Sequence, residues 1–100
     1  MKKLFISQPM KGKTDEQILK ERHNIINKVK KEVNEDIILI DSFLTDVPEN
    51  AKPLWYLGKS LELMSEADIV AFASGFEKYR GCKIEHECAL SYEIPILIYC

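Results

Sequence analysis

The stretch YRGCKIEHECALSYE, residues 79–93, gathers five side chains that could do chemistry: Cys82, Glu85, His86, Glu87 and Cys88. Thiolates and imidazoles are the usual ligands of zinc, whereas a carboxylate near the start of a helix could act as a nucleophile. If the stretch is helical, each residue turns it by about 100°, so Cys88 lies about 240° from Cys82. The cysteines and His86 therefore do not converge on one ion, and we expect neither a metal site nor a cofactor.

The same geometry predicts how this helix packs. With Ile84 set at zero, Cys88 and Tyr92 fall within about 80° of it and mark a buried stripe. Glu85 and Ala89 fall at the edge of the stripe, and the residues that point to solvent are Lys83, His86 and Glu87. Glu85 is thus the carboxylate between core and cleft, where it either does chemistry or only complements the positive helix N-terminus. We expect the helix amides to keep it ionised at neutral pH.

Composition narrows the class of protein. The chain has 100 residues and a formal net charge of -2, which predicts a single domain, residues 1–100, without a basic surface for a nucleic-acid polymer. No apolar run reaches the roughly 20 residues that cross a membrane, and the opening MKKLFISQPM is too short for a signal peptide. Three cysteines, an odd number without paired spacing, indicate reduced thiols in a cytoplasmic protein. Because so small a chain buries a modest core, we expect a homodimer or a higher homo-oligomer.

Apolar runs alternate with amphipathic segments along the chain. Short apolar runs predict strands at residues 3–7, 36–41, 68–73 and 94–99. Helices are expected at 14–34, where Thr14 and Gln17 form a capping box, at 53–67 after Pro53, and at 81–92. Strands that are apolar on both faces predict a parallel sheet with helices on both sides. We therefore expect an α/β flavodoxin-like three-layer sandwich, with four parallel strands in the order 2-1-3-4 and three helices.

Two loops are expected at the ligand-binding edge of this sheet. In such folds ligands bind at the carboxyl ends of the strands, beside the switch point between strands 1 and 3. In the loop after strand 1, we expect the ligand to contact Ser7, Gln8, Met10 and Gly12. The loop after strand 3 leads into a helix N-terminus that could bind phosphate. In this loop and at the helix start we expect ligand contacts from Ser74, Gly75, Tyr79, Arg80, Gly81 and Cys82. Either loop could equally be a plain solvated connection.

The spacing Gly81-x-x-x-Glu85-x-x-x-Ala89, after the pair Ala67 and Asp68, resembles the nucleoside 2-deoxyribosyltransferase family. The blocks LFISQPMKGKT and FEKYRGCKIEHECA are similar to those of its short phage and bacterial members. The family includes deoxynucleoside 5′-monophosphate N-glycosidases and has the flavodoxin-like fold. The resemblance implies that Glu85 is a nucleophile that attacks C1′ of a (deoxy)nucleoside or its 5′-monophosphate and displaces the base. Water or a second base then resolves the glycosyl-enzyme with retention.

Three positions differ from the pattern of active family members. The tyrosine usual in strand 1 is Phe5, the aspartate eight residues before Asp68 is Ser60, and the aspartate common six residues before the glutamate is Tyr79. The resemblance implies that Phe5 and Ser60 also contact the substrate. Protonation of a leaving base needs an acid, for which Glu62 and Tyr79 are candidates. Two hypotheses therefore stand. One is an N-glycosidase or transferase that acts on a nucleoside or nucleotide, and the other is a non-catalytic nucleotide-binding module of the same fold.

Three further side chains have more than one interpretation. Arg22 lies on the apolar side of the first helix, where it either reaches a phosphate or a partner subunit or snorkels to solvent. Trp55 and Tyr56 open the second helix as core or interface residues, or as a platform on which a base stacks. His23 is expected on the surface.

Overall fold

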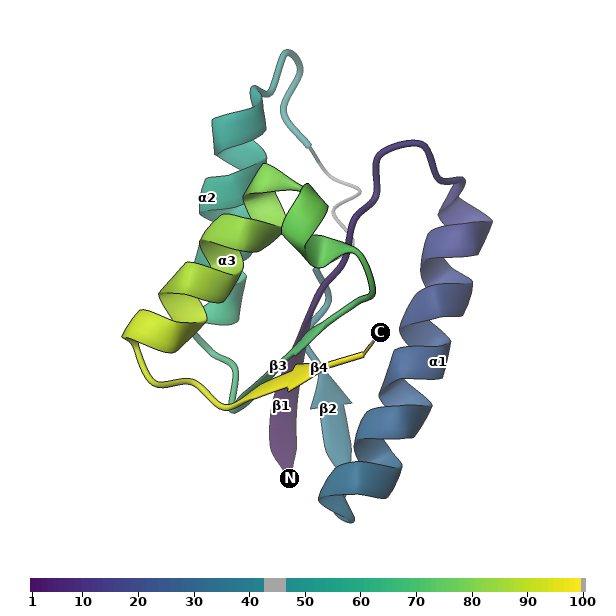
Figure 1. Ribbon diagram of the computed structural model, residues 1–100. Helices are drawn as coiled ribbons and strands as arrows, with labels where there is room; N and C mark the ends of the chain where they lie inside the picture. The colour runs from purple at the N-terminus through teal and green to yellow at the C-terminus, as the bar shows by residue number, and fades with distance from the viewer. Residues whose placement is uncertain (43–46, 100) are drawn as a thin grey trace.

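Four short apolar strands form the centre of the structure (Figure 1). The computed structural model describes residues 1–42 and 47–99. The strands pair in the order β2-β1-β3-β4, every pair is parallel, and their bounds are β1 (Lys2–Ser7), β2 (Ile37–Leu39), β3 (Ile69–Phe72) and β4 (Ile96–Ile98). The outer strands β2 and β4 are shorter than predicted. The sheet order and the three α-helices confirm the predicted flavodoxin-like sandwich.

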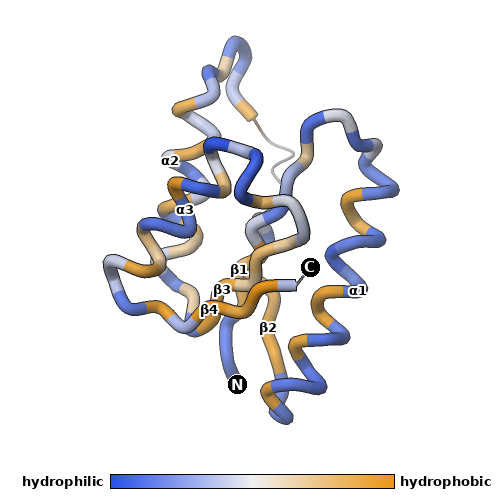
Figure 2. Tube along the Cα trace, viewed as in Figure 1, coloured by the Kyte–Doolittle hydropathy of each residue, from blue (hydrophilic) through white to orange (hydrophobic). Residues whose placement is uncertain are grey.

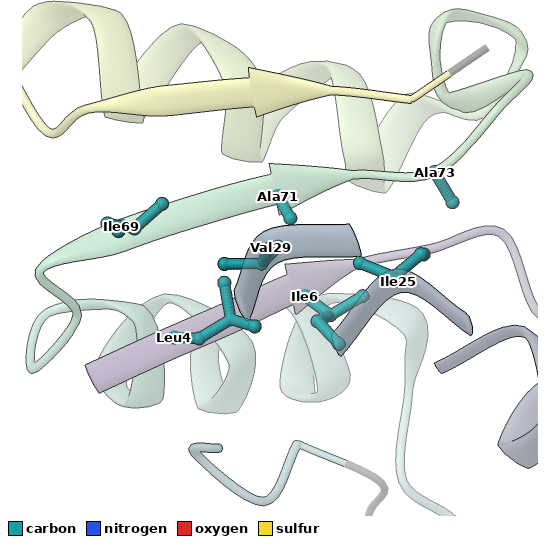
Figure 3. Close-up of a cluster of buried hydrophobic side chains, with 7 residues drawn as sticks. All are labelled: Leu4, Ile6, Ile25, Val29, Ile69, Ala71 and Ala73. Carbon is teal, nitrogen blue, oxygen red and sulfur yellow. The ribbon is translucent and has the colours of Figure 1, made fainter. Parts of the chain in front are cut away.

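The first half of the core lies between the sheet and α1 (Asp15–Val33). Successive side chains of a strand point to opposite faces, so Leu4 and Ile6 of β1 share one face. Both pack with Ile25 and Val29 of α1. The remaining members of the cluster shown in Figure 3 are Ile69 and Ala71 of β3 and Ala73, which follows the strand. Figure 2 shows hydrophobic residues recurring along α1 with hydrophilic residues between them, as expected for a helix that buries one side.

The second half of the core lies on the opposite face, beneath α2 (Pro53–Met64) and α3 (Arg80–Ser91). Figure 1 shows α1 on one side of the sheet and these two helices on the other. Phe5 points to this side and packs in a cluster with Val70, Phe72, Met64 and Ala89. Ser7 lies two positions after Phe5 and therefore points to the same side, toward α3. The alternation along β1 thus decides which helix the last side chain of the strand meets.

Local signals set where the helices begin and end. The Thr14 side chain accepts a hydrogen bond from the Gln17 backbone N–H and the Gln17 side chain accepts one from the Thr14 N–H, which confirms the capping box. Asn34 ends α1 in the left-handed conformation, and Pro53 opens α2 as predicted. A short 3₁₀ helix, η1 (Phe76–Lys78), lies within the predicted loop before α3. None of the helices in the described part of the chain is long and apolar enough to cross a membrane.

The buried face of α3 is rotated by part of a turn from the predicted one, so that prediction is wrong. Ile84 and Tyr92, which were expected in the buried stripe, are 40% and 80% exposed. The buried residues of the helix are instead Cys82, Glu85 and Ala89. Their i, i+3, i+7 spacing centres the buried stripe near Glu85, which therefore lies within the packed face and not at its edge.

His86 is also placed differently from the prediction. Its half-buried ring lies edge-on to Phe72, with ring centroids 5.1 Å apart, and it packs at the same separation against Phe76 of η1. The contact with Phe76 thus joins η1 to α3 through His86, which was expected to point to solvent. His23 is exposed, as predicted.

We predict that Leu4→Ala lowers the free energy of unfolding by about 2–5 kcal/mol, because the substitution leaves a cavity at a fully buried position. Leu19→Ala is the matched control, since Leu19 is 49% exposed on α1, and it should change the free energy of unfolding by about 0.5 kcal/mol or less. Urea unfolding followed by circular dichroism measures both. Equal losses at the two positions would contradict the assigned core.

Candidate functional site

The end of β1 and the second turn of α3 meet in one buried polar contact. Ser7 is the last residue of β1, and its hydroxyl donates a hydrogen bond of 2.7 Å to Oε1 of Glu85. Ser7 is 1% exposed and Glu85 is 7% exposed. The second carboxylate oxygen, Oε2, has no hydrogen-bond partner among the described residues. The contact therefore fixes one oxygen of Glu85 and leaves the other for a ligand.

Burial controls the protonation of Glu85. Loss of hydration raises the pKa of Glu85 from its ordinary 4.5 to about 7, while the hydrogen bond from Ser7 acts in the opposite direction. About half of the molecules therefore carry the ionised carboxylate at neutral pH. The expectation that helix amides outweigh desolvation and keep Glu85 ionised is wrong in its balance of effects, because desolvation is the largest influence on the pKa of Glu85.

Cys82 lies beside the Ser7–Glu85 pair and is 6% exposed. Burial raises the pKa of its thiol, the hydrogen bond with Ser7 lowers it, the charge of Glu85 raises it again, and Lys13 lowers it. Because the net direction is upward, the thiol stays neutral near pH 7 and does not compete with Glu85 as a nucleophile.

A cavity of about 950 Å³ is lined by Glu85 and by nine of the twelve predicted substrate-binding residues: Phe5, Ser7, Gln8, Met10, Ser60, Tyr79, Arg80, Gly81 and Cys82. The other three predicted residues, Gly12, Ser74 and Gly75, do not line it. Gly12 and Gly75 have φ values of 81° and 83°, so they serve the turns of their loops, where other residues would be strained. The residues around the switch point of the sheet are thus brought together, while the tips of the two loops are not.

The charges around the cavity are unequal. Four cations line it, Lys11, Arg22, Lys52 and Arg80, whereas Glu85 is the only carboxylate among the described lining residues. Lys11, Lys52 and Arg80 are exposed, and Arg22 and Glu85 are buried. The cavity is therefore electropositive at its rim although the whole chain carries a formal charge of -2.

The loop after β1 is anchored to α1 by a polar cluster. Gln8 Nε2 donates to the Ile18 carbonyl at 3.2 Å and to Glu21 Oε1 at 2.8 Å, and Lys13 Nζ lies 3.2 Å from the same carboxylate oxygen. Both partners of the Gln8 amide are acceptors, which fixes its nitrogen toward them. Gln8 Oε1 is buried without a partner. The cluster holds the loop, and with it Met10, at the mouth of the cavity.

Arg22 forms a buried polar pair in the cavity wall. It is 3% exposed, and its Nη2 donates a hydrogen bond of 2.6 Å to Ser42 Oγ. Burial lowers the pKa of the guanidinium, and the nearby Asp41 raises it. The snorkelling interpretation of Arg22 is therefore wrong, because its head group does not reach solvent. Sequence patterns did not reveal Ser42, since the pair forms only where α1 passes the carboxyl end of β2.

Residues of α2 line one part of the cavity, and only Tyr56 and Ser60 among them were expected at a ligand site. Leu54 is 77% exposed and lines the cavity together with Tyr56 and Leu57. Glu62, considered above as a proton donor, lies outside the lining and forms an exposed ion pair with Lys59. Apolar periodicity alone could not distinguish a core face of α2 from a face that borders a cavity.

Metal ligands are not grouped in the described part of the chain: no three His, Cys, Asp or Glu side chains there are placed to hold an ion. Cys82 and Cys88 are free thiols. Cys100 lies outside the described residues.

Comparison with known proteins gives one match. Residues 2–98 match the family described as a domain of unknown function, DUF4406. No curated protein and no solved structure matches the chain.

We predict that Glu85→Gln stabilises the protein more at pH 8 than at pH 4. The pKa of Glu85 is about 7 in the folded state and near 4.5 when exposed, so the folded protein holds this proton more tightly. Wild-type stability therefore falls as the pH rises from 4.5 through 7, whereas glutamine accepts the Ser7 hydrogen bond without ionising. The difference in free energy of unfolding, variant minus wild type, should grow by up to about 3 kcal/mol. Urea unfolding at both pH values measures it, and a difference that does not change with pH would contradict the buried carboxylate.

Ser7→Ala should raise the pKa of Glu85 further, because it removes the donor that favours the ionised carboxylate. The test is an NMR titration of the Glu85 side-chain carboxyl carbon, whose midpoint should move to higher pH in the variant. Ser91→Ala, an exposed change at the far end of α3, is the control and should leave the midpoint in place. A midpoint unchanged by Ser7→Ala would argue against the contact.

Proposed function

Since the chain belongs to the DUF4406 family, whose description names no activity, we propose its function from the chemistry of its own cavity. The protein cleaves the N-glycosidic bond of a (deoxy)nucleoside or its 5′-monophosphate, or transfers the sugar to a second base, with Glu85 as the nucleophile. One observation carries this proposal: a buried carboxylate in the cavity wall whose Oε1 is held by Ser7 while Oε2 has no partner among the described residues.

The reaction has two steps. In the first, a carboxylate oxygen of Glu85 bonds to C1′ as the bond from C1′ to the base breaks, and the electron pair of that bond leaves with the base nitrogen. In the second, a water oxygen attacks C1′, the Glu85 ester is released as a carboxylate, and the water gives up one proton. Two inversions retain the configuration at C1′. A second base in place of water gives transfer.

The surroundings of Glu85 support this role. A nucleophile must be oriented, and the Ser7 hydroxyl does this from the strand end. In the nucleoside 2-deoxyribosyltransferases, which the sequence resembles, a tyrosine of strand 1 usually has that task. Here Phe5 has no hydroxyl and packs in the core, and Ser7, two residues later on the same face, supplies one. The raised pKa also means that the ionised, reactive fraction of Glu85 increases as the pH rises through about 7.

A second candidate is a non-catalytic nucleotide-binding module. It is favoured by the charge of the cavity, since Glu85 is the only carboxylate among the described lining residues and Glu62 points elsewhere. A retaining mechanism normally uses a second group as the acid for the leaving base. The cations at the rim would hold a nucleotide whether or not its glycosidic bond is cleaved.

The remaining parts of the proposal concern the setting of the protein. Cys82 and Cys88 are unpaired, which fits a reducing compartment such as the cytoplasm. A homodimer or higher homo-oligomer would give so small a chain additional buried surface, and exposed apolar side chains outside the cavity, such as Leu90 and Tyr92, are available for it.

We predict that Glu85→Gln lowers turnover by at least about a thousandfold, because the amide keeps the shape of the side chain but is not a nucleophile. Glu87→Gln is the matched control. Glu87 is exposed and lies about 160° from Glu85 around α3, so turnover should be nearly unchanged. A panel of nucleosides and 5′-monophosphates, with chromatography of the released base, measures both variants.

Equal turnover by wild type and Glu85→Gln on any cleaved substrate would end the nucleophile assignment. Tight binding of a nucleotide without release of base from any member of the panel would favour the binding module.

A further inference from the structure

Cleavage of the glycosidic bond requires a base that can leave, and the acids in the cavity lining determine which bases can. A neutral base departs slowly from C1′ unless an acid protonates it, a contribution of about 100- to 10,000-fold. Glu85 must be ionised to act as the nucleophile, so it cannot supply that proton in the same step. Among the other described lining residues, Tyr79 and Cys82 offer a phenol and a thiol, which are far weaker acids than a carboxylic acid. Because the described lining residues offer only such weak acids besides Glu85, the cavity favours a substrate whose base leaves without a proton.

A ring nitrogen that is already positively charged in the glycoside meets this condition, because it departs as a neutral molecule. Such a base also suits the electrostatics around Glu85. The ionised carboxylate attracts the cationic ring and is buried, whereas Lys11, Lys52 and Arg80 are exposed. The buried cation of the lining, Arg22, donates a hydrogen bond to Ser42. The glycosidic bond of the substrate therefore belongs at Ser7 and Glu85.

The exposed cations at the rim of the cavity favour an anionic group on the ligand. Lys11, Lys52 and Arg80 come from three separate elements, the loop after β1, the cap of α2 and the first turn of α3, and all are exposed cavity residues. Cations arranged in this way bind a polyanion such as a pyrophosphate.

Size and apolar surface complete the description of the ligand. Small-molecule sites usually have volumes of roughly 300–1,000 Å³, and this cavity, at about 950 Å³, is at the upper end of that range. Its volume is larger than a single nucleoside fills. Leu54, Tyr56 and Ile84 line it and are 77%, 42% and 40% exposed. These side chains offer a surface against which a second base can pack beyond the phosphates.

We infer that the substrate is a pyridinium dinucleotide, whose N-glycosidic bond to the cationic ring lies at Glu85 and whose pyrophosphate lies among Lys11, Lys52 and Arg80. This inference rests on the proposed function and specifies its substrate. The bond between C1′ and the pyridinium nitrogen breaks, its electron pair neutralises the ring, and Glu85 takes the sugar. Water then releases the sugar from Glu85, so that each turnover yields one neutral pyridine base, one ribosyl product and one proton.

The test compares oxidised nicotinamide adenine dinucleotide with thymidine 5′-monophosphate as substrates of the full chain. Released nicotinamide and thymine are quantified by chromatography. We expect kcat/KM for the oxidised dinucleotide to exceed that for the monophosphate by at least about 100-fold, the contribution that a missing acid would have made. The reduced dinucleotide, whose ring is neutral, should not be cleaved but should inhibit competitively.

Two lysine variants test the place of the pyrophosphate. Lys52→Ala should raise KM for the oxidised dinucleotide by about tenfold or more, the effect of a lost charged hydrogen bond. Lys83→Ala is the control, since Lys83 is exposed on α3 outside the cavity, and KM should not change. Equal effects of the two variants would overturn the assigned position of the phosphates.

The outcomes separate this inference from the proposed function. Cleavage of neutral-base monophosphates that depends on Glu85, without a preference for the oxidised dinucleotide, would overturn the inference and leave the proposed function standing. The absence of Glu85-dependent cleavage with both kinds of substrate would overturn both.

Discussion

The hydrogen bond between Ser7 and Glu85 is the contact on which the site depends. It joins the end of the central strand to the second turn of α3, 78 residues later in the chain. Because β1 alternates its side chains between two helical layers, only the face shared by Phe5 and Ser7 can reach Glu85. The same contact fixes one carboxylate oxygen and leaves the other for a ligand. Orientation, burial and protonation of Glu85 thus follow from where β1 ends.

Ionisation of this largely desolvated carboxylate opposes folding as the pH rises through about 7, and the rest of the molecule must offset that cost. Apolar clusters on both faces of the sheet provide the offset, with Leu4 and Val29 fully buried on one face and Val70 and Phe72 on the other. A carboxylate buried in a polar surface loop would regain water by a small movement. Glu85 is held in place more firmly, because Cys82 and Ala89 on either side of it are buried where α3 packs.

Much of the fold could be predicted from the sequence, because its strands are short apolar runs and Thr14 and Pro53 mark helix starts. The phase of α3 could not, since Ile84 and Tyr92 look like core residues although one lines the cavity and the other is exposed. Most candidate site residues follow from the topology, which gathers strand ends at one edge. The pair of Arg22 and Ser42 does not, because no local pattern reports a contact between separate elements.

The most direct test of the central claim, that Glu85 forms a covalent bond to the sugar, is to trap that bond. The protein is mixed with a 2′-fluoro-substituted substrate, which slows breakdown of the glycosyl-enzyme, then digested and mapped by mass spectrometry. The account predicts a glycosyl adduct on the peptide that contains Glu85, localised to that side chain by fragmentation and absent from Glu85→Gln. An adduct on another residue, or release of base by wild type and Glu85→Gln at the same rate, would contradict it.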